Sequence, residues 1–194
     1  NENEYLPITS PVRGIVRAVD VRPGQTVQRG DILAMIGSSE IGLARSDVQL
    51  REAELEIAQQ EYAWADEISR NVESLLALLE QKPATSAVEA AFQGKLLGEH
   101  RDDILTGYAK LQLAESATLR TNPLGEQGVI SGRIVQERQS ERDVAAANFL
   151  SVCEQTKLEC VGAQRRAKVA LDNAHRQVTI SKQHLAALCG PFST

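Results

Sequence analysis

The sequence has few aromatic residues and no long apolar stretch. Phenylalanine, tryptophan and tyrosine together make up 4% of its 194 residues, a content that suits exposed helices better than one thick hydrophobic core. The most apolar run covers only residues 75–79, whereas a membrane-spanning helix needs about 20 such residues. The chain also opens at Asn1 without a charged and apolar leader. We therefore expect any leader or lipid anchor to lie outside these residues.

Cysteine is scarce, and no block of one charge sign is present. The net charge of −5 comes from interspersed acidic and basic residues, which gives no electrostatic surface for nucleic acid or an anionic membrane. Three cysteines make no disulfide framework. Cys153 and Cys160 are about 10 Å apart along one expected helix, too far to form a disulfide. We expect them to be small apolar side chains on its buried face.

Residues for catalysis or metal binding do not form a recognisable set. His100, His175 and His184 share no ligand spacing, and Met35 is the only methionine. No Ser/His/Asp arrangement or glycine-rich phosphate motif occurs. We therefore expect a protein that is not an enzyme, with no metal site and no cofactor.

Residues 5–39 have the composition of short β-strands. Runs of valine and isoleucine alternate with turn dipeptides, of which Pro23-Gly24 predicts a type II turn and Gly30-Asp31 a second tight turn. Three or four short strands are expected. So few strands cannot close a core, so the segment needs another layer to cover it.

From residue 44 onward the apolar pattern changes to that of a coiled coil. Nine of eleven positions at alternating spacings of four and three are apolar or aromatic, and nine of twelve are apolar in a second stretch. The first set is Ala44, Val48, Arg51, Leu55, Ala58, Tyr62, Ala65, Ser69, Val72, Leu76 and Leu79; the second is Leu150, Cys153, Lys157, Cys160, Gln164, Ala167, Leu171, Ala174, Val178, Ser181, Leu185 and Leu188. Antiparallel pairing of the two helices buries both stripes.

Two interruptions divide the helical segment. Lys82-Pro83 should end the first helix, which restarts near Arg101. Residues 121–130 are dense in turn formers and predict the reversal of the chain. If residues 82–99 are a local excursion or a short extra helix on the side of the hairpin, the two arms are about equally long and form one hairpin. The alternative is a shorter bundle of three or four helices.

The β segment carries a resemblance to a known domain. Ser10-Pro11-x-x-Gly14-x-Val16, followed by Val21-x-Pro23-Gly24-x-x-Val27-x-x-Gly30-Asp31-x-Leu33, resembles the first half of a biotinyl/lipoyl-type domain. In carriers of that fold a modifiable lysine follows about ten residues after the glycine that corresponds to Gly30. Glu40 stands there in this chain and cannot form the amide to biotin or lipoate. The resemblance therefore implies the fold without the carrier function.

The order of the segments resembles that of periplasmic adaptors, also called membrane fusion proteins, of the secretion and efflux-pump family. The resemblance implies a mainly α fold with a small β part, in which a long antiparallel coiled-coil α-hairpin is inserted in a half-present lipoyl-like domain. Residues 1–39 would form the first half of that domain, residues 40–189 the hairpin, and residues 190–194 the start of the second half. It also implies a periplasmic location, held at the inner membrane through segments outside this sequence.

The same resemblance implies partners and a docking site. Adaptors of tripartite pumps carry at the hairpin tip an arginine, a leucine four residues later and a serine seven after that, a spacing matched by Arg120, Leu124 and Ser131. These residues would contact a TolC-like outer-membrane channel, while an inner-membrane transporter and further copies in a ring or funnel complete the assembly. The plainer interpretation makes Arg120 a solvated helix-end cation, Leu124 a cap on the hairpin core and Ser131 an N-cap.

Two other functions stay open on the sequence. One is a biotin or lipoate carrier domain of an enzyme complex, which Glu40 opposes. The other is a generic coiled-coil scaffold, in which the β segment would be incidental.

Overall fold

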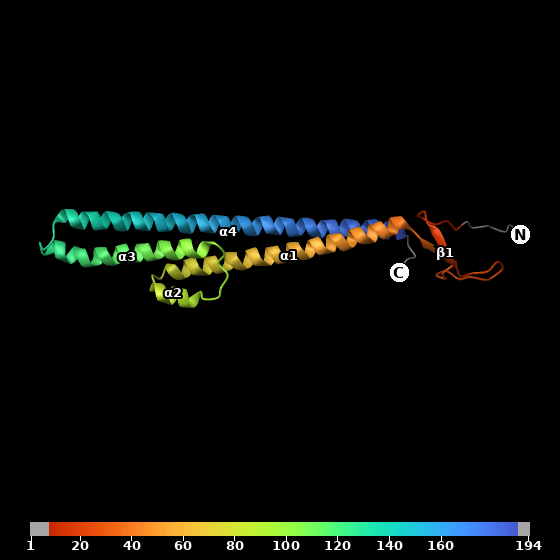
Figure 1. The fold of residues 1–194 in the computed structure, drawn as a ribbon, viewed down its shortest axis with the longest axis horizontal. Coiled ribbons are helices and arrows are strands. Elements are labelled where there is room, and N and C mark those ends of the chain that lie inside the picture. The colour runs from red at the N-terminus through yellow and green to blue at the C-terminus, as the bar shows by residue number, and fades with distance from the viewer. Residues whose placement is uncertain (1–7, 190–194) are drawn as a thin grey trace. The chain divides into compact units, whose positions relative to one another are not determined.

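The computed structural model describes residues 8–189. Its elements, in chain order, are β1 (Ile15–Val19), β2 (Ala34–Gly37), α1 (Ser39–Leu79), α2 (Thr85–Ala91), α3 (His100–Glu126) and α4 (Gly132–Cys189) (Figure 1). The predicted fold class, mainly α with a small β part, is confirmed. The expected return to extended chain at residues 190–194 lies outside the described residues.

The chain divides into two compact units. The first comprises Asn1–Gln59 with Val169–Thr194, and the second comprises Gln60–Lys168. Helices α1 and α4 contribute residues to both.

The β part of the first unit is a two-stranded antiparallel sheet. Ile15 pairs with Gly37 and Val19 with Ala34, with a bulge between Val16 and Ala18. The expectation of three or four strands is therefore wrong for the described residues, because the chain between β1 and β2 has two turns and otherwise no regular structure. Ile15, Val19 and other apolar side chains of this sheet are exposed, as two strands alone offer no second layer to cover them.

Both predicted turns are present between the strands. The amide of Gln25 donates to the carbonyl of Arg22 at 3.0 Å across Pro23-Gly24. Gly24 has a φ of 83°, the positive value that a type II turn requires after proline. A second turn closes through the bond from the Asp31 amide to the Gln28 carbonyl at 3.1 Å.

The helical part of the first unit pairs the start of α1 with the end of α4. Buried residues of this pair all occupy predicted stripe positions: Val48, Ala58, Val178 and Ser181. The hydroxyl of Ser181 donates to Asp47 Oδ2 at 2.5 Å, and Lys182 Nζ lies 2.7 Å from Glu52 Oε1. These contacts place the end of α4 beside the start of α1, so the two helices are antiparallel here.

The second unit holds the main hydrophobic core. It forms where α1 ends, α2 packs and α3 begins, and α4 contributes Cys160. Helix α2 lies on the side of α1 that faces away from α4 (Figure 1). The core comprises Val72, Leu75, Leu79, Val88, Phe92, Leu97, Ile104, Tyr108 and Cys160. Residues 82–99, which were expected to be a local excursion or a short extra helix, contain α2 and supply three side chains of this core: Val88, Phe92 and Leu97.

In the second unit α3 runs antiparallel beside α4 (Figure 1). Thr118 Oγ1 donates to the Arg138 carbonyl at 3.1 Å. Two glycines of α3 allow close approach: a Cβ at Gly107 would lie 3.2 Å from Phe149 Cδ2, and one at Gly125 would lie 2.4 Å from a methyl of Val135. These glycines are about five helical turns apart and so share one face. Helix α4 therefore pairs with α1 toward its end and with α3 toward its start.

This exchange of partners corrects part of the predicted stripe on α4. Leu150 and Lys157 were expected in the seam, yet both are exposed, Leu150 by 59%. Thr156 is buried instead, with 4% exposure, and Phe149 packs against the core. The buried positions thus shift by one residue, because α3 meets α4 on a different side from α1.

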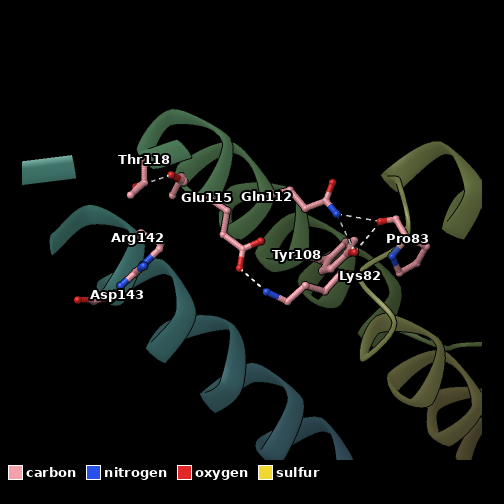
Figure 2. A network of polar contacts seen from close by, with 9 residues as sticks. Lys82, Pro83, Tyr108, Gln112, Glu115, Thr118, Arg142 and Asp143 are labelled. Atoms are coloured by element: carbon pink, nitrogen blue, oxygen red, sulfur yellow. Dashed lines mark hydrogen bonds and ion pairs between the residues drawn. The ribbon is translucent and has the colours of Figure 1, made fainter. Parts of the chain in front are cut away.

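A polar network fixes the loop after α1 to α3. The Pro83 carbonyl accepts hydrogen bonds from the Tyr108 hydroxyl at 2.6 Å and from Gln112 Nε2 at 2.8 Å, and Figure 2 shows both side chains pointing to it. Lys82 has a φ of 52°, and its ammonium lies 2.7 Å from Glu115 Oε1. The loop conformation is therefore maintained from α3, by side chains 25 or more residues later in the chain.

Candidate docking site at the turn between α3 and α4

Helix α3 extends further than the sequence suggested. Residues 121–130 were expected to form the reversal, but α3 continues to Glu126 with Pro123 inside it. Proline lacks an amide hydrogen, so the carbonyl of Leu119 has no helical donor at Pro123. Only one helical turn follows Pro123, so few helical hydrogen bonds lie beyond it.

A Schellman motif ends α3. The Val129 amide donates to the Leu124 carbonyl at 2.8 Å, and the Gly128 amide donates to the Gly125 carbonyl at 3.0 Å. Gly128 has a φ of 71°, the left-handed conformation that this motif needs and that glycine adopts without cost from a Cβ. The turn is thus formed by backbone hydrogen bonds.

Ser131 occupies the N-cap position of α4. Its carbonyl accepts a hydrogen bond from the Ile134 amide at 2.9 Å, and the helix begins at Gly132. Serine is among the residues favoured at this position. The residue is exposed, so its side chain is accessible to a partner as well as to the helix end.

The structure brings the three expected docking residues to one end of the α3–α4 hairpin. Arg120 is exposed one helical turn before Leu124, on the same face of α3. Leu124 is 41% exposed, although its backbone is part of the Schellman motif. Leu124 and Ser131 therefore stand on the two sides of the turn. Part of the Leu124 side chain is therefore accessible to another molecule.

The sequence reasoning missed further apolar side chains at this end. Val129 is 65% exposed within the turn, and Leu119 and Ile134 are exposed on the helices beside it. The sequence contained a signal for Val129: an apolar residue directly after the glycine of a Schellman motif commonly contacts the residue five positions earlier, which is Leu124 here. Leu124 and Val129 occupy the C3 and C″ positions of the Schellman motif, which commonly contact each other, so this exposed pair offers apolar surface for an interaction.

A depression of about 590 Å³ lies next to the turn. Asn122 and Glu126 of α3 line it, together with Gln136 and Gln139 of α4. Glycines at positions 125 and 132 also border it and contribute no side chain to fill it. Val135 lines it as well, so the depression has both polar and apolar walls.

Two cysteines of α4 have perturbed thiols. Burial raises the pKa of the Cys160 and Cys153 thiols, and neighbouring glutamates raise it further. Within residues 8–189 no three histidine, cysteine, aspartate or glutamate side chains are arranged to hold a metal ion. Across the same residues, none of the helices has the length and apolarity needed to cross a bilayer.

Comparisons with known proteins give the following matches. The family described as "CzcB-like, barrel-sandwich hybrid domain" matches residues 4–176. A solved structure, "Structure of the periplasmic adaptor protein EmrA", is 21% identical, with a TM-score of 0.39. The match covers 92% of this chain and 54% of that one, so the chain spans about half the length of that protein. No curated protein matches the sequence.

Proposed function

We propose a bridging function from the premise that this chain belongs to the family of CzcB-like barrel-sandwich hybrid domains, and thus to the membrane fusion proteins, or periplasmic adaptors. In this proposal the protein works in the periplasm and connects an inner-membrane transporter to a TolC-like outer-membrane channel. The observation that supports it most is the turn between α3 and α4, which exposes apolar side chains from a backbone held by a Schellman motif.

The docking chemistry follows from the exposed residues. The guanidinium of Arg120 offers several N–H donors to carbonyls at a helix end of the channel. Leu124 would fill an apolar groove between channel helices, and the hydroxyl of Ser131 would hydrogen-bond at the rim. The rigid turn keeps the entropy cost of binding low, since little backbone has to be ordered on contact.

Side-by-side association of several copies is the second part of the proposal. Leu43, Leu50 and Ile57 recur every seven residues on α1, outside the buried stripe, and each is more than half exposed. An apolar residue at every heptad on an exposed helix face is the pattern of a helix–helix interface. We assign this face to contact with a neighbouring copy.

The other two functions receive less support. Glu40 lies in the first turn of α1, whereas a carrier domain would present a lysine on a β-hairpin there. A scaffold with an incidental β segment would not require the family match to run from residue 4 through both strands.

A photo-crosslinking experiment in cells tests the docking proposal. A photoreactive residue at Leu124 should capture the outer-membrane channel, whereas the same residue at Leu113, which is also exposed on α3, should not. The variant Arg120→Asp should reduce export, and Lys110→Asp, another exposed charge change on α3, should leave it unchanged. Loss of one central contact of about 2 kcal/mol would weaken binding about 30-fold. Absence of channel among the Leu124 products, with full export by Arg120→Asp, would refute docking through this turn.

A further inference from the structure

Helix α4 has an exposed apolar face in the first unit. Val169 and Ile180 are each more than half exposed, and the eleven residues between these positions correspond to about three helical turns, so both side chains lie on one face. That face, here called the α4 face, points away from Val178 and Ser181, which are buried where α4 packs against α1. Exposed apolar side chains on one helix face indicate a helix–helix contact. Because α1 of the same chain packs on the other side of α4, the contact has to come from another molecule.

Acidic side chains border the exposed apolar residues of α1. Glu40, Asp47 and Glu54 recur every seven residues, and each lies three or four positions from a member of the exposed row, which places it beside that row on the helix surface. Arg51 pairs with Asp47 and Glu54 and offsets one of the three charges. Two α1 helices that met through this row would bring like charges together, which disfavours the contact. The row, here called the α1 row, comprises Leu43, Leu50 and Ile57.

The α4 face carries a basic residue. Arg176 lies seven residues after Val169 and four before Ile180, so it projects from the same face. Its side chain is exposed and donates a hydrogen bond to the neutral amide oxygen of Asn173, while Asp172 borders the face on the side of Arg176 opposite Ile180. A guanidinium has five N–H donors in a planar fork. Arg176 therefore has donors left for a carboxylate of a second molecule.

We propose that the α4 face of one copy receives the α1 row of the next copy, with Arg176 of the first paired to Glu54 of the second. Each copy then uses its α1 row toward one neighbour and its α4 face toward the other. Such a head-to-tail contact generates a ring when the rotation closes. This inference rests on the side-by-side association proposed above and adds to it the surface that the α1 row contacts.

The contacts within one copy show that the two surfaces lie at matching levels along the helices. Ser181 donates to Asp47, so α4 residues near 180 stand beside α1 residues near 48, and the two helices run antiparallel. Copies that stand side by side and point the same way share these levels. Ile180 of one copy then lies within a turn of Leu50 of the next, and the proposed arginine and glutamate are also within a turn of each other.

Cysteine crosslinking of the full-length protein in cells tests this arrangement. Leu50→Cys and Ile180→Cys are introduced together after Cys153, Cys160 and Cys189 have been replaced by alanine. A short bismaleimide should then give a ladder of products beyond the dimer, because each copy supplies two different cysteines to two neighbours. Either cysteine alone should give monomer. Dimers formed by Leu50→Cys alone, or an absence of products from the double variant, would overturn the head-to-tail contact.

A charge exchange tests the ion pair in the protein that keeps its natural cysteines. Glu54→Arg and Arg176→Glu should each weaken self-association about fivefold in sedimentation measurements, and the two together should restore it. Glu56→Arg is the matched control, since Glu56 is exposed on the opposite side of α1 from Glu54, and it should leave association unchanged. Glu54→Arg also breaks the pair with Arg51. Because that loss is not repaired from α4, recovery in the double variant identifies a contact between copies.

The outcomes separate this contact from the association on which it rests. Self-association that both single variants leave unchanged, or that the double variant fails to recover, would overturn the pairing of Arg176 with Glu54 and leave side-by-side packing intact. An unmodified protein that stays monomeric and gives no crosslinked product would instead refute the association, and this contact with it. Capture of a channel from Leu124 is measured independently of both.

Discussion

Removing one hydroxyl, with Tyr108→Phe, tests whether α3 holds the loop after α1. The Tyr108 hydroxyl donates to the Pro83 carbonyl at 2.6 Å and accepts from Gln112 Nε2 at 2.8 Å (Figure 2). Phenylalanine keeps the ring, which is 2% exposed and lies 5.6 Å from the ring of Phe149. The variant therefore changes hydrogen bonding and leaves the packing in place.

The expected cost is about 1–2 kcal/mol. A neutral hydrogen bond contributes about 0.5–1.5 kcal/mol net, and the loss of the hydroxyl removes two bonds, although the Pro83 carbonyl keeps its bond from Gln112 Nε2. Lys82 makes the loop more sensitive, because its left-handed conformation costs roughly 1–3 kcal/mol that neighbouring contacts must offset. Residues 80–99 should therefore exchange amide hydrogens faster in the variant, while α4 keeps its protection.

Alkaline pH gives an independent readout of the same contact. Burial, together with the charge of Glu115, raises the pKa of Tyr108 above its ordinary value of 10.0. A raised pKa in the folded state means that the stabilisation is complete below pH 10 and is lost as the pH rises toward the folded value. The free energy of unfolding should therefore fall more steeply above pH 10 for the unmodified protein than for Tyr108→Phe. Equal stability at pH 7, equal exchange at residues 80–99 and parallel alkaline curves would refute the role assigned to this hydroxyl.

Two further predictions concern helix contacts. Gly125→Ala should lower the free energy of unfolding by about 1 kcal/mol or more, because its Cβ would meet a Val135 methyl at 2.4 Å and overpacking of 1–3 kcal/mol outweighs the helix propensity gained from alanine. Gly107→Ala, whose Cβ would lie 3.2 Å from the edge of Phe149, should leave the free energy of unfolding unchanged or raise it in the same denaturation experiment. An equal increase in the free energy of unfolding for both variants would contradict the close approach at Gly125. Leu50→Glu should reduce self-association in sedimentation measurements without lowering the thermal midpoint, since Leu50 is more than half exposed; unchanged association would remove this face of α1 from the proposed interface.

The heptad pattern predicted much of the buried face of α1. Every predicted position from Ala44 to Leu79 is buried or half-buried. The pattern omits Leu75, which is fully buried because the end of α1 also packs against α2 and α3. On α4 the same reasoning holds from Cys160 onward and fails at Leu150 and Lys157. An apolar pattern along one helix predicts its buried face correctly only if the same helix packs against it over the whole length. Helix α4 changes its partner from α1 to α3, and this change depends on core contacts of residues 82–99, whose sequence has no helical periodicity.

The turn was predictable in position and less so in detail. Pro123 suggested an early end to α3, but proline removes only one hydrogen bond, and the bonds that close the turn come from Gly128 and Val129. Asn122 was counted only as a turn former, and its buried oxygen depends on how α3 meets α4. The resemblance to adaptors of tripartite pumps, with its residue spacing astride the expected reversal, pointed to Arg120, Leu124 and Ser131, and their role in docking stays a prediction.

The Schellman motif has a consequence for how recognition by this turn can diverge. Its hydrogen bonds join main-chain atoms, and its one strict requirement is a residue at position 128 that tolerates a positive φ. The side chains of Gln127, Val129 and Ile130 can therefore be exchanged with little effect on the path of the chain. Related proteins could acquire new partners by point substitution at these three positions, while the backbone conformation of the turn stays the same.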